Sequence, residues 1–89
     1  MRVMSPFERQ VINITDNIAN MLISKNEKYG NSALEPKRIF SKASSVEQIL
    51  VRIDDKLSRI ANQSELEDED VYMDLIGYLI LLKIAKDEN

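Results

Sequence analysis

Apolar residues recur at spacings of three and four in three separate stretches of the chain, which is the period of an α-helix. The first stretch opens with Ser5, Pro6 and Glu8, the pattern of a capped helix start. Its apolar stripe consists of Phe7, Val11, Ile14, Ile18 and Met21 or Leu22. Gly30 is suited to end this helix, because glycine readily adopts the left-handed conformation found just past helix ends. The pattern predicts a first helix over about 6–28.

Two further stretches repeat this pattern, and each begins with a serine followed by a glutamate three residues later. Ser44 with Glu47 opens a predicted helix over about 45–62, and Ser64 with Glu67 opens one over about 66–85. Between the first two helices we expect a loop over 31–43, with room for one short helical turn around 36–41 and with Ile39-Phe40 as its apolar anchor.

The second half of the third predicted helix is apolar on nearly every side, which is typical of a central helix or one at a subunit interface. Gly77 interrupts it at a cost of about 1 kcal/mol relative to alanine, which indicates a close approach of another helix. No strand alternation occurs in the chain. We therefore predict one all-α domain spanning 1–89, in an antiparallel three-helix arrangement.

A chain of 89 residues has a thin hydrophobic core, because so short a chain buries only about 60 to 65% of its unfolded surface. We expect a homo-oligomer in which two copies pair through the third helix. The apolar run over 75–85 is too short to span a bilayer, and the amino-terminal residues lack the apolar run of a signal peptide. These features predict a cytoplasmic protein with no membrane partner.

Composition removes several kinds of chemistry. The chain has no cysteine and no histidine, which excludes disulfides, thiolate metal sites, Ser-His-Asp catalysis and the usual zinc sites. Its net charge of -3 and sequence pI near 4.9 make nucleic acid an unlikely partner, because nonspecific binding to nucleic acid requires a basic surface.

Carboxylates form the first group of candidate ligands. Glu67, Asp70 and Asp74 are separated by three and four residues and share one helix face, while Asp54 and Asp55 flank the apolar stripe of the second helix. Oxygen ligands from two helices suit Mg²⁺. The candidate metal ligands are Asp54, Asp55, Asp70 and Asp74. First-turn acids also complement the helix dipole without any metal. Asp74 lies beyond that turn beside apolar residues, so we expect it to be paired or metal-bound.

Cations form the second group. Arg52, Lys56 and Arg59 recur at spacings of four and three along the second helix, beside these aspartates. Guanidinium and ammonium groups suit phosphate. The alternative is ordinary exposed ion pairing of Asp55 with Arg59 or Arg52.

The end of the first helix forms the third group: Lys25, Lys28, Tyr29, Asn31 and Ser32. Tyr29 could stack on a base while Lys25 or Lys28 reaches a phosphate. The alternative is an ordinary helix terminus, where lysines favour the negative end of the dipole and a tyrosine covers the edge of the core.

Three segments together resemble a known family. They are Lys25-Asn26-Glu27-Lys28-Tyr29-Gly30-Asn31-Ser32, Arg52-Ile53-Asp54-Asp55-Lys56-Leu57-Ser58-Arg59, and Asp70 with Asp74 ahead of Leu75-Ile76-Gly77-Tyr78. Over about residues 22–85 the chain resembles the nucleotide-modification-associated domain family of small phage and bacterial proteins, which is distantly similar to MazG-like all-α nucleoside triphosphate pyrophosphohydrolases. The resemblance implies a phage-type nucleotide-binding protein acting in the bacterial cytoplasm.

MazG-like enzymes bind magnesium through a Glu-Glu-x-x-Glu pattern on one helix and a Glu-x-x-Asp pattern on the next. Asp74 matches the last position of the second pattern, but Val71 stands at its first position, and Asp54-Asp55-Lys56 replaces the triple glutamate. Three functions therefore stay open. They are magnesium-dependent hydrolysis of a nucleoside triphosphate by water, sequestration of a nucleotide or cyclic nucleotide without turnover, and a helical protein–protein interaction module.

Overall fold

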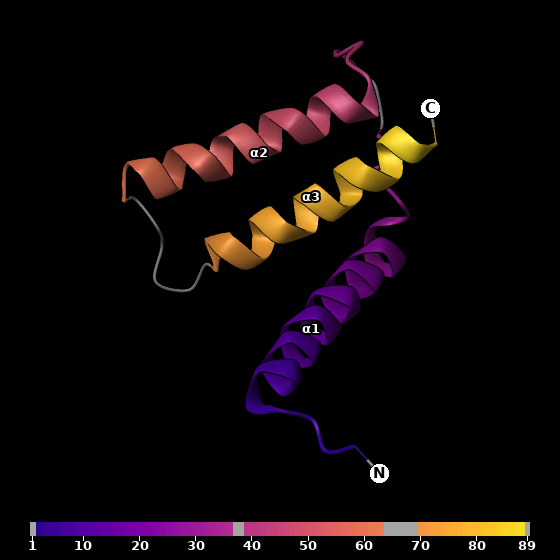
Figure 1. Ribbon diagram of the computed structural model, residues 1–89. Helices are drawn as coiled ribbons and strands as arrows, with labels where there is room; N and C mark the ends of the chain where they lie inside the picture. Colours follow the sequence, from indigo (N-terminus) through magenta and orange to yellow (C-terminus); the bar gives the residue numbers. More distant parts are fainter. Residues whose placement is uncertain (1, 37–38, 64–69, 89) are drawn as a thin grey trace.

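The computed structural model describes residues 2–36, 39–63 and 70–88, and within these it contains three α-helices and no strand (Figure 1). The helices are α1 (Pro6–Tyr29), α2 (Ser45–Ala61) and α3 (Val71–Asp87). The all-α prediction is confirmed. The third helix begins at Val71, directly after its cap Asp70, and not near Leu66 as expected, so Asp74 lies in its first turn and not beyond it. The expected capping pair Ser64 and Glu67 lies outside the described residues.

Each helix begins with a side chain that accepts a hydrogen bond from an otherwise unsatisfied backbone N–H. The Ser5 hydroxyl accepts from the Glu8 amide at 3.1 Å, and the Ser44 hydroxyl accepts from the Glu47 amide at 3.2 Å. These are the starts that the sequence predicts. At α3 the cap is Asp70, whose carboxylate accepts from the Met73 amide at 3.0 Å.

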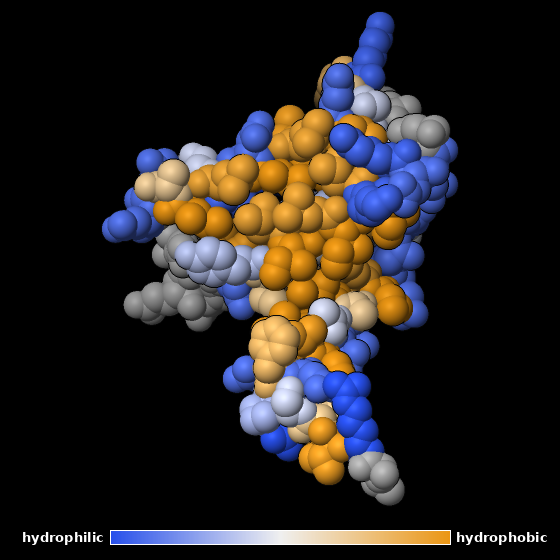
Figure 2. Space-filling view, viewed as in Figure 1, coloured by the Kyte–Doolittle hydropathy of each residue, from blue (hydrophilic) through white to orange (hydrophobic). Residues whose placement is uncertain are grey.

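Helices α2 and α3 lie side by side and run in opposite directions (Figure 1). Their contact forms the core, which centres on Ile49, Ile53 and Ala85. Partly buried apolar side chains surround these three: Leu34, Val46, Leu75, Tyr78, Leu81 and Leu82. Figure 2 shows that a broad apolar face extends over this pair of helices.

Helix α1 packs against α3 and, among the described residues, makes no packing contact with α2. The two helices approach closely at Gly77, where an added Cβ would lie 3.1 Å from Met21 Cε and 3.3 Å from Leu22 Cδ2. The close approach that Gly77 predicts is confirmed, and so is the central position of α3. The antiparallel three-helix arrangement forms only in part, because α1 reaches one of its two expected neighbours.

The connection between α1 and α2 is anchored differently from the prediction. Leu34 packs against the core, whereas Ile39 and Phe40 are 77% and 98% exposed. The expected anchor at Ile39-Phe40 is therefore wrong. A turn forms earlier, at 31–35, and part of the expected helical turn over 36–41 lies outside the described residues. No described helix combines the length and apolar character needed to cross a membrane.

Candidate functional site

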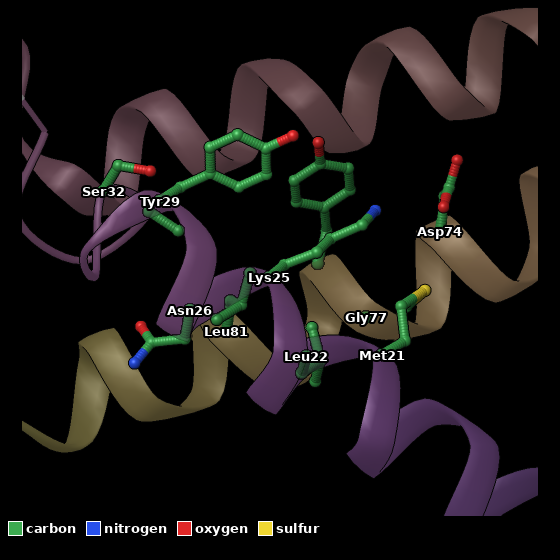
Figure 3. Close-up of a pocket in the computed structure, with 11 residues that line it drawn as sticks. Met21, Leu22, Lys25, Asn26, Tyr29, Ser32, Asp74, Gly77 and Leu81 are labelled. Atoms are coloured by element: carbon green, nitrogen blue, oxygen red, sulfur yellow. The ribbon is translucent and has the colours of Figure 1, made fainter.

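A pocket of about 330 Å³ opens where the end of α1, the turn after it and the middle of α3 meet (Figure 3). The described residues that line it are Met21, Leu22, Lys25, Asn26, Tyr29, Ser32, Ala33, Asp74, Gly77, Tyr78 and Leu81. Three predicted site residues from the α1 corner, Lys25, Tyr29 and Ser32, thus share one hollow with Asp74 of α3. We call this hollow the main pocket.

The turn after α1 shapes one wall of the main pocket. Gly30 and Asn31 both adopt left-handed conformations, with φ of 65° and 59°, and their amides donate to the Asn26 carbonyl at 2.9 and 3.2 Å. The Asn31 carbonyl then accepts from the amides of Leu34 and Glu35. This reversal brings Ser32 to the same pocket as Tyr29. Asn31, a predicted ligand contact, therefore orders the turn and does not line the pocket.

A second, adjacent hollow of about 270 Å³ contains Arg52. Its described lining residues are Ser32, Ala33, Pro36, Gln48, Ile49, Arg52 and Tyr78. Ser32, Ala33 and Tyr78 line both hollows, so the two adjoin at these three residues. We call the second hollow the arginine pocket. It brings the predicted cation of α2 next to the predicted residues of the α1 corner.

Asp74 is held by an ion pair between α3 and α2. Its Oδ2 lies 3.4 Å from Lys56 Nζ, and the two side chains are only 26% and 12% exposed. The expectation that Asp74 carries a partner is confirmed. The pair keeps the carboxylate at the edge of the main pocket and brings a second cation next to it, although Lys56 itself is not among the lining residues.

The remaining predicted residues lie outside both pockets. Lys28 places its ammonium 5.3 Å from the centre of the Tyr29 ring, a distance that fits a cation–π contact. Arg59 Nε lies 3.4 Å from Asp55 Oδ2 one turn earlier, which is the ordinary ion pair weighed as the alternative. Asp54 is exposed on α2.

The four candidate metal ligands do not converge. Asp70 caps α3, Asp55 pairs with Arg59, and Asp74 pairs with Lys56. Within 2–36, 39–63 and 70–88, no group of three or more acidic, histidine or cysteine side chains is placed to hold a metal. Among the described residues that line the main pocket, Asp74 is the one carboxylate.

Comparison with protein-family models, with curated proteins and with solved structures found no match to this chain. The function must therefore be inferred from the two pockets and from the residues that line them.

Sequence reasoning missed the apolar and aromatic wall of the main pocket, which Met21, Leu22, Tyr78 and Leu81 form. Their helical spacing is that of core residues. Apolar residues that line a pocket in a small domain have the same spacing, so the sequence does not distinguish the two. Gly77 could have located this wall, because a glycine inside an apolar helix indicates where another helix packs closely against it. The apolar neighbours of that glycine are the residues that line the hollow.

Proposed function

We propose that this protein binds a small phosphate-bearing ligand of nucleotide type, with its base in the main pocket and its phosphates toward the arginine pocket. One observation supports this most directly: the main pocket joins Lys25, Tyr29 and Ser32 from one end of α1 with Asp74 from α3. These residues come from two predicted clusters, separated by more than forty positions in the chain.

The chemistry of the two pockets suits the two ends of such a ligand. Tyr29 and Tyr78 offer aromatic rings, and Met21, Leu22 and Leu81 offer apolar contacts for a flat base. Lys25 in the main pocket and Arg52 in the arginine pocket supply positive charge, and Ser32 lines both pockets, so phosphate oxygens would lie where the two pockets adjoin. The main pocket, at about 330 Å³, falls at the small end of the range for ligand sites, which favours a mononucleotide.

Binding without turnover is the form of this function that the arrangement favours. Among the described residues that line the main pocket, the one carboxylate is Asp74, which lies 3.4 Å from the Lys56 ammonium group, and Asp54, Asp55 and Asp70 do not line it. Hydrolysis is the second candidate, because Asp74 and Lys56 could together orient a phosphate-bound ion and a water.

Thermal unfolding against a panel of nucleotides, cyclic nucleotides and inorganic phosphate tests the proposal. A ligand present at a hundred times its dissociation constant stabilises the fold by about 2.7 kcal/mol, which for a domain of this size raises Tm by roughly 10 to 20 °C. We expect one nucleotide class to give such a shift. A panel that gives no shift, with no binding by calorimetry, would contradict the proposal.

A matched pair of tyrosine variants links binding to the main pocket. Tyr29 and Tyr72 are similarly exposed, at 59% and 56%, but only Tyr29 lines the main pocket. Tyr29→Ala removes a stacking surface worth about 1 to 3 kcal/mol, so affinity should fall roughly 5- to 150-fold. Tyr72→Ala should bind as the unmodified protein does. Equal losses in both variants would locate the ligand elsewhere.

Measuring the release of phosphate or pyrophosphate distinguishes binding without turnover from hydrolysis. With the best ligand of the panel and added magnesium, we expect binding to persist after chelation and no product to accumulate at high protein concentration. Product formation that requires magnesium and disappears in Asp74→Asn would instead establish hydrolysis.

A further inference from the structure

The pair formed by α2 and α3 exposes an apolar surface on one side. Leu50 and Leu57 of α2 are 40% and 48% exposed, and Ile76 and Leu79 of α3 are 38% and 48% exposed. We call these four residues the outer face.

Helix periodicity places the outer face on the side away from both pockets. On α3, Asp74, Tyr78 and Leu81 follow one line of the helix and line the main pocket. Ile76 and Leu79 follow a line about half a turn away. On α2, Gln48 and Arg52 line the arginine pocket, and Leu50 and Leu57 lie across the helix from them. Helix α1 packs on α3 at Gly77 and leaves the outer face bare.

The amount of exposed surface indicates that a further layer is missing. The chain exposes 7249 Å², whereas a compact monomer of 10.2 kDa exposes about 5,300 Å². The excess is more than the roughly 800 Å² that each partner contributes to an interface of standard size. Only Ile18, Ile49, Ile53, Val71 and Ala85 are buried hydrophobic residues within the described chain. The chain as a whole thus leaves more surface uncovered than one interface of standard size would bury, and covering the outer face would add core that the monomer lacks.

We propose that a second copy of this chain covers the outer face, with two α2–α3 pairs packed face to face about a two-fold axis. A surface that meets its own copy must keep like charges apart. Leu50, Leu57, Ile76 and Leu79 are apolar, and the exposed carboxylate of Asp54, one turn after Leu50 on the same line of α2, has to lie at the rim of the contact. The next residue along the line of Ile76 and Leu79 is Lys83, whose ammonium lies 2.7 Å from Asp87 on its own helix. The edge of the outer face therefore carries an ion pair instead of a lone charge. The resulting four-helix layer leaves both pockets of each copy open to solvent.

Molar mass in solution, measured by light scattering after gel filtration, tests this assembly. We expect twice the chain mass for the unmodified protein and the single chain mass for Leu79→Glu, because a carboxylate in this apolar contact would be buried without a partner. The control is Val51→Glu, since Val51 is 65% exposed on α2 but lies off the outer face. Circular dichroism verifies that each variant keeps its helices. An unmodified protein that stays monomeric at the highest reachable concentration overturns the proposal.

Cross-linking locates the interface without destabilising it. The chain contains no cysteine, so a single introduced cysteine reacts at one known position. Leu79 lies at the midpoint of α3, and Leu79→Cys should give a covalent dimer with a short bismaleimide. Phe7→Cys should not, although Phe7 is 72% exposed. Cross-linking at Phe7 and not at Leu79 would show that copies meet through the apolar stripe of α1, and would overturn the assignment to the outer face.

Discussion

At the scale of single residues, two ion pairs of α3 differ in both distance and exposure, and we expect exposure to decide how much each one stabilises the fold. Lys83 and Asp87 approach to 2.7 Å, but their side chains are 75% and 61% exposed. Lys56 and Asp74 are 3.4 Å apart, with side chains 12% and 26% exposed. Water screens the first pair strongly and the second much less, so the longer contact should stabilise the fold more.

Removing each carboxylate tests this difference. Asp74→Ala should lower the free energy of unfolding by about 1 to 3 kcal/mol, because it deprives a largely buried ammonium of this carboxylate. Asp87→Ala should cost about 0.3 to 0.5 kcal/mol, as exposed helix pairs one turn apart do. Urea denaturation with a common slope measures both. Equal losses would mean that Lys56 gains nothing from Asp74 beyond what a surface pair provides.

The two arginines of α2 give a second comparison at this scale. Arg52 lines the arginine pocket, whereas Arg59 pairs with Asp55 and lines neither pocket. Hydrogen bonds to charged groups contribute about 1.5 to 3 kcal/mol, so Arg52→Gln should weaken binding of the nucleotide identified by thermal shift at least tenfold. Arg59→Gln should leave that affinity within twofold. The reverse ranking in titration calorimetry would place the phosphate beyond the arginine pocket.

At the scale of helices, the chain's own pattern predicts much of the fold. Serine caps, apolar spacing and Gly30 locate α1 and α2 to within a residue, because capping and helix termination are decided by neighbours in sequence. Residues nearby in the sequence do not determine which helix packs against each apolar stripe. The stripe of α1 begins at Phe7, which is 72% exposed, and is buried only from Ile18, three residues before Met21 meets α3. Periodicity shows that a face is apolar but not which surface covers it.

The same limit explains why the candidate site is only partly predictable. Of the twelve candidate site residues that the sequence marks, the two pockets contain five: Lys25, Tyr29, Ser32, Arg52 and Asp74. Asp55, Arg59 and Asp70 have equally suitable side chains, yet each makes a local contact within its own helix. Sequence spacing cannot separate a residue that interacts one turn away from one that faces another helix, because both satisfy the same period.

The contact of α1 with α3 at Gly77 creates the main pocket, which gives a prediction at the scale of helices. Gly77→Leu adds four carbon atoms where the side chains of Met21 and Leu22 would already lie 3.1 and 3.3 Å from the first of them. Such overpacking costs about 1 to 3 kcal/mol, part of which a better helix propensity offsets. Ligand affinity should fall more than stability, because α1 is pushed away from the pocket. Nucleotide titration beside urea denaturation measures the two effects separately.

Gly77→Ala is the control for this variant. Its single added carbon meets only the flexible ends of the Met21 and Leu22 side chains, and alanine favours the helix by about 1 kcal/mol. Stability should stay within about 1 kcal/mol of the unmodified protein, with binding retained. Loss of binding in Gly77→Ala without loss of stability would show that the ligand itself occupies the space beside Gly77.

At the scale of the whole molecule, the monomer is more extended than its length requires. Its radius of gyration is 15.5 Å, against about 12 Å for a compact domain of this length. A second copy on the outer face and a nucleotide in the main pocket would each add burial on opposite sides of the α2–α3 pair. Because the two sites share no residue, their contributions to stability should add.

This independence gives a prediction that neither site makes alone. Association with a second copy makes Tm rise with protein concentration, and a ligand raises Tm further. Raising protein concentration should therefore shift Tm by the same amount with and without saturating nucleotide. The monomeric Leu79→Glu variant should lose the concentration dependence and keep the nucleotide affinity. An affinity that falls together with the dimer would instead mean that the second copy supplies part of the pocket, so that the ligand site would lie between two chains and not within one.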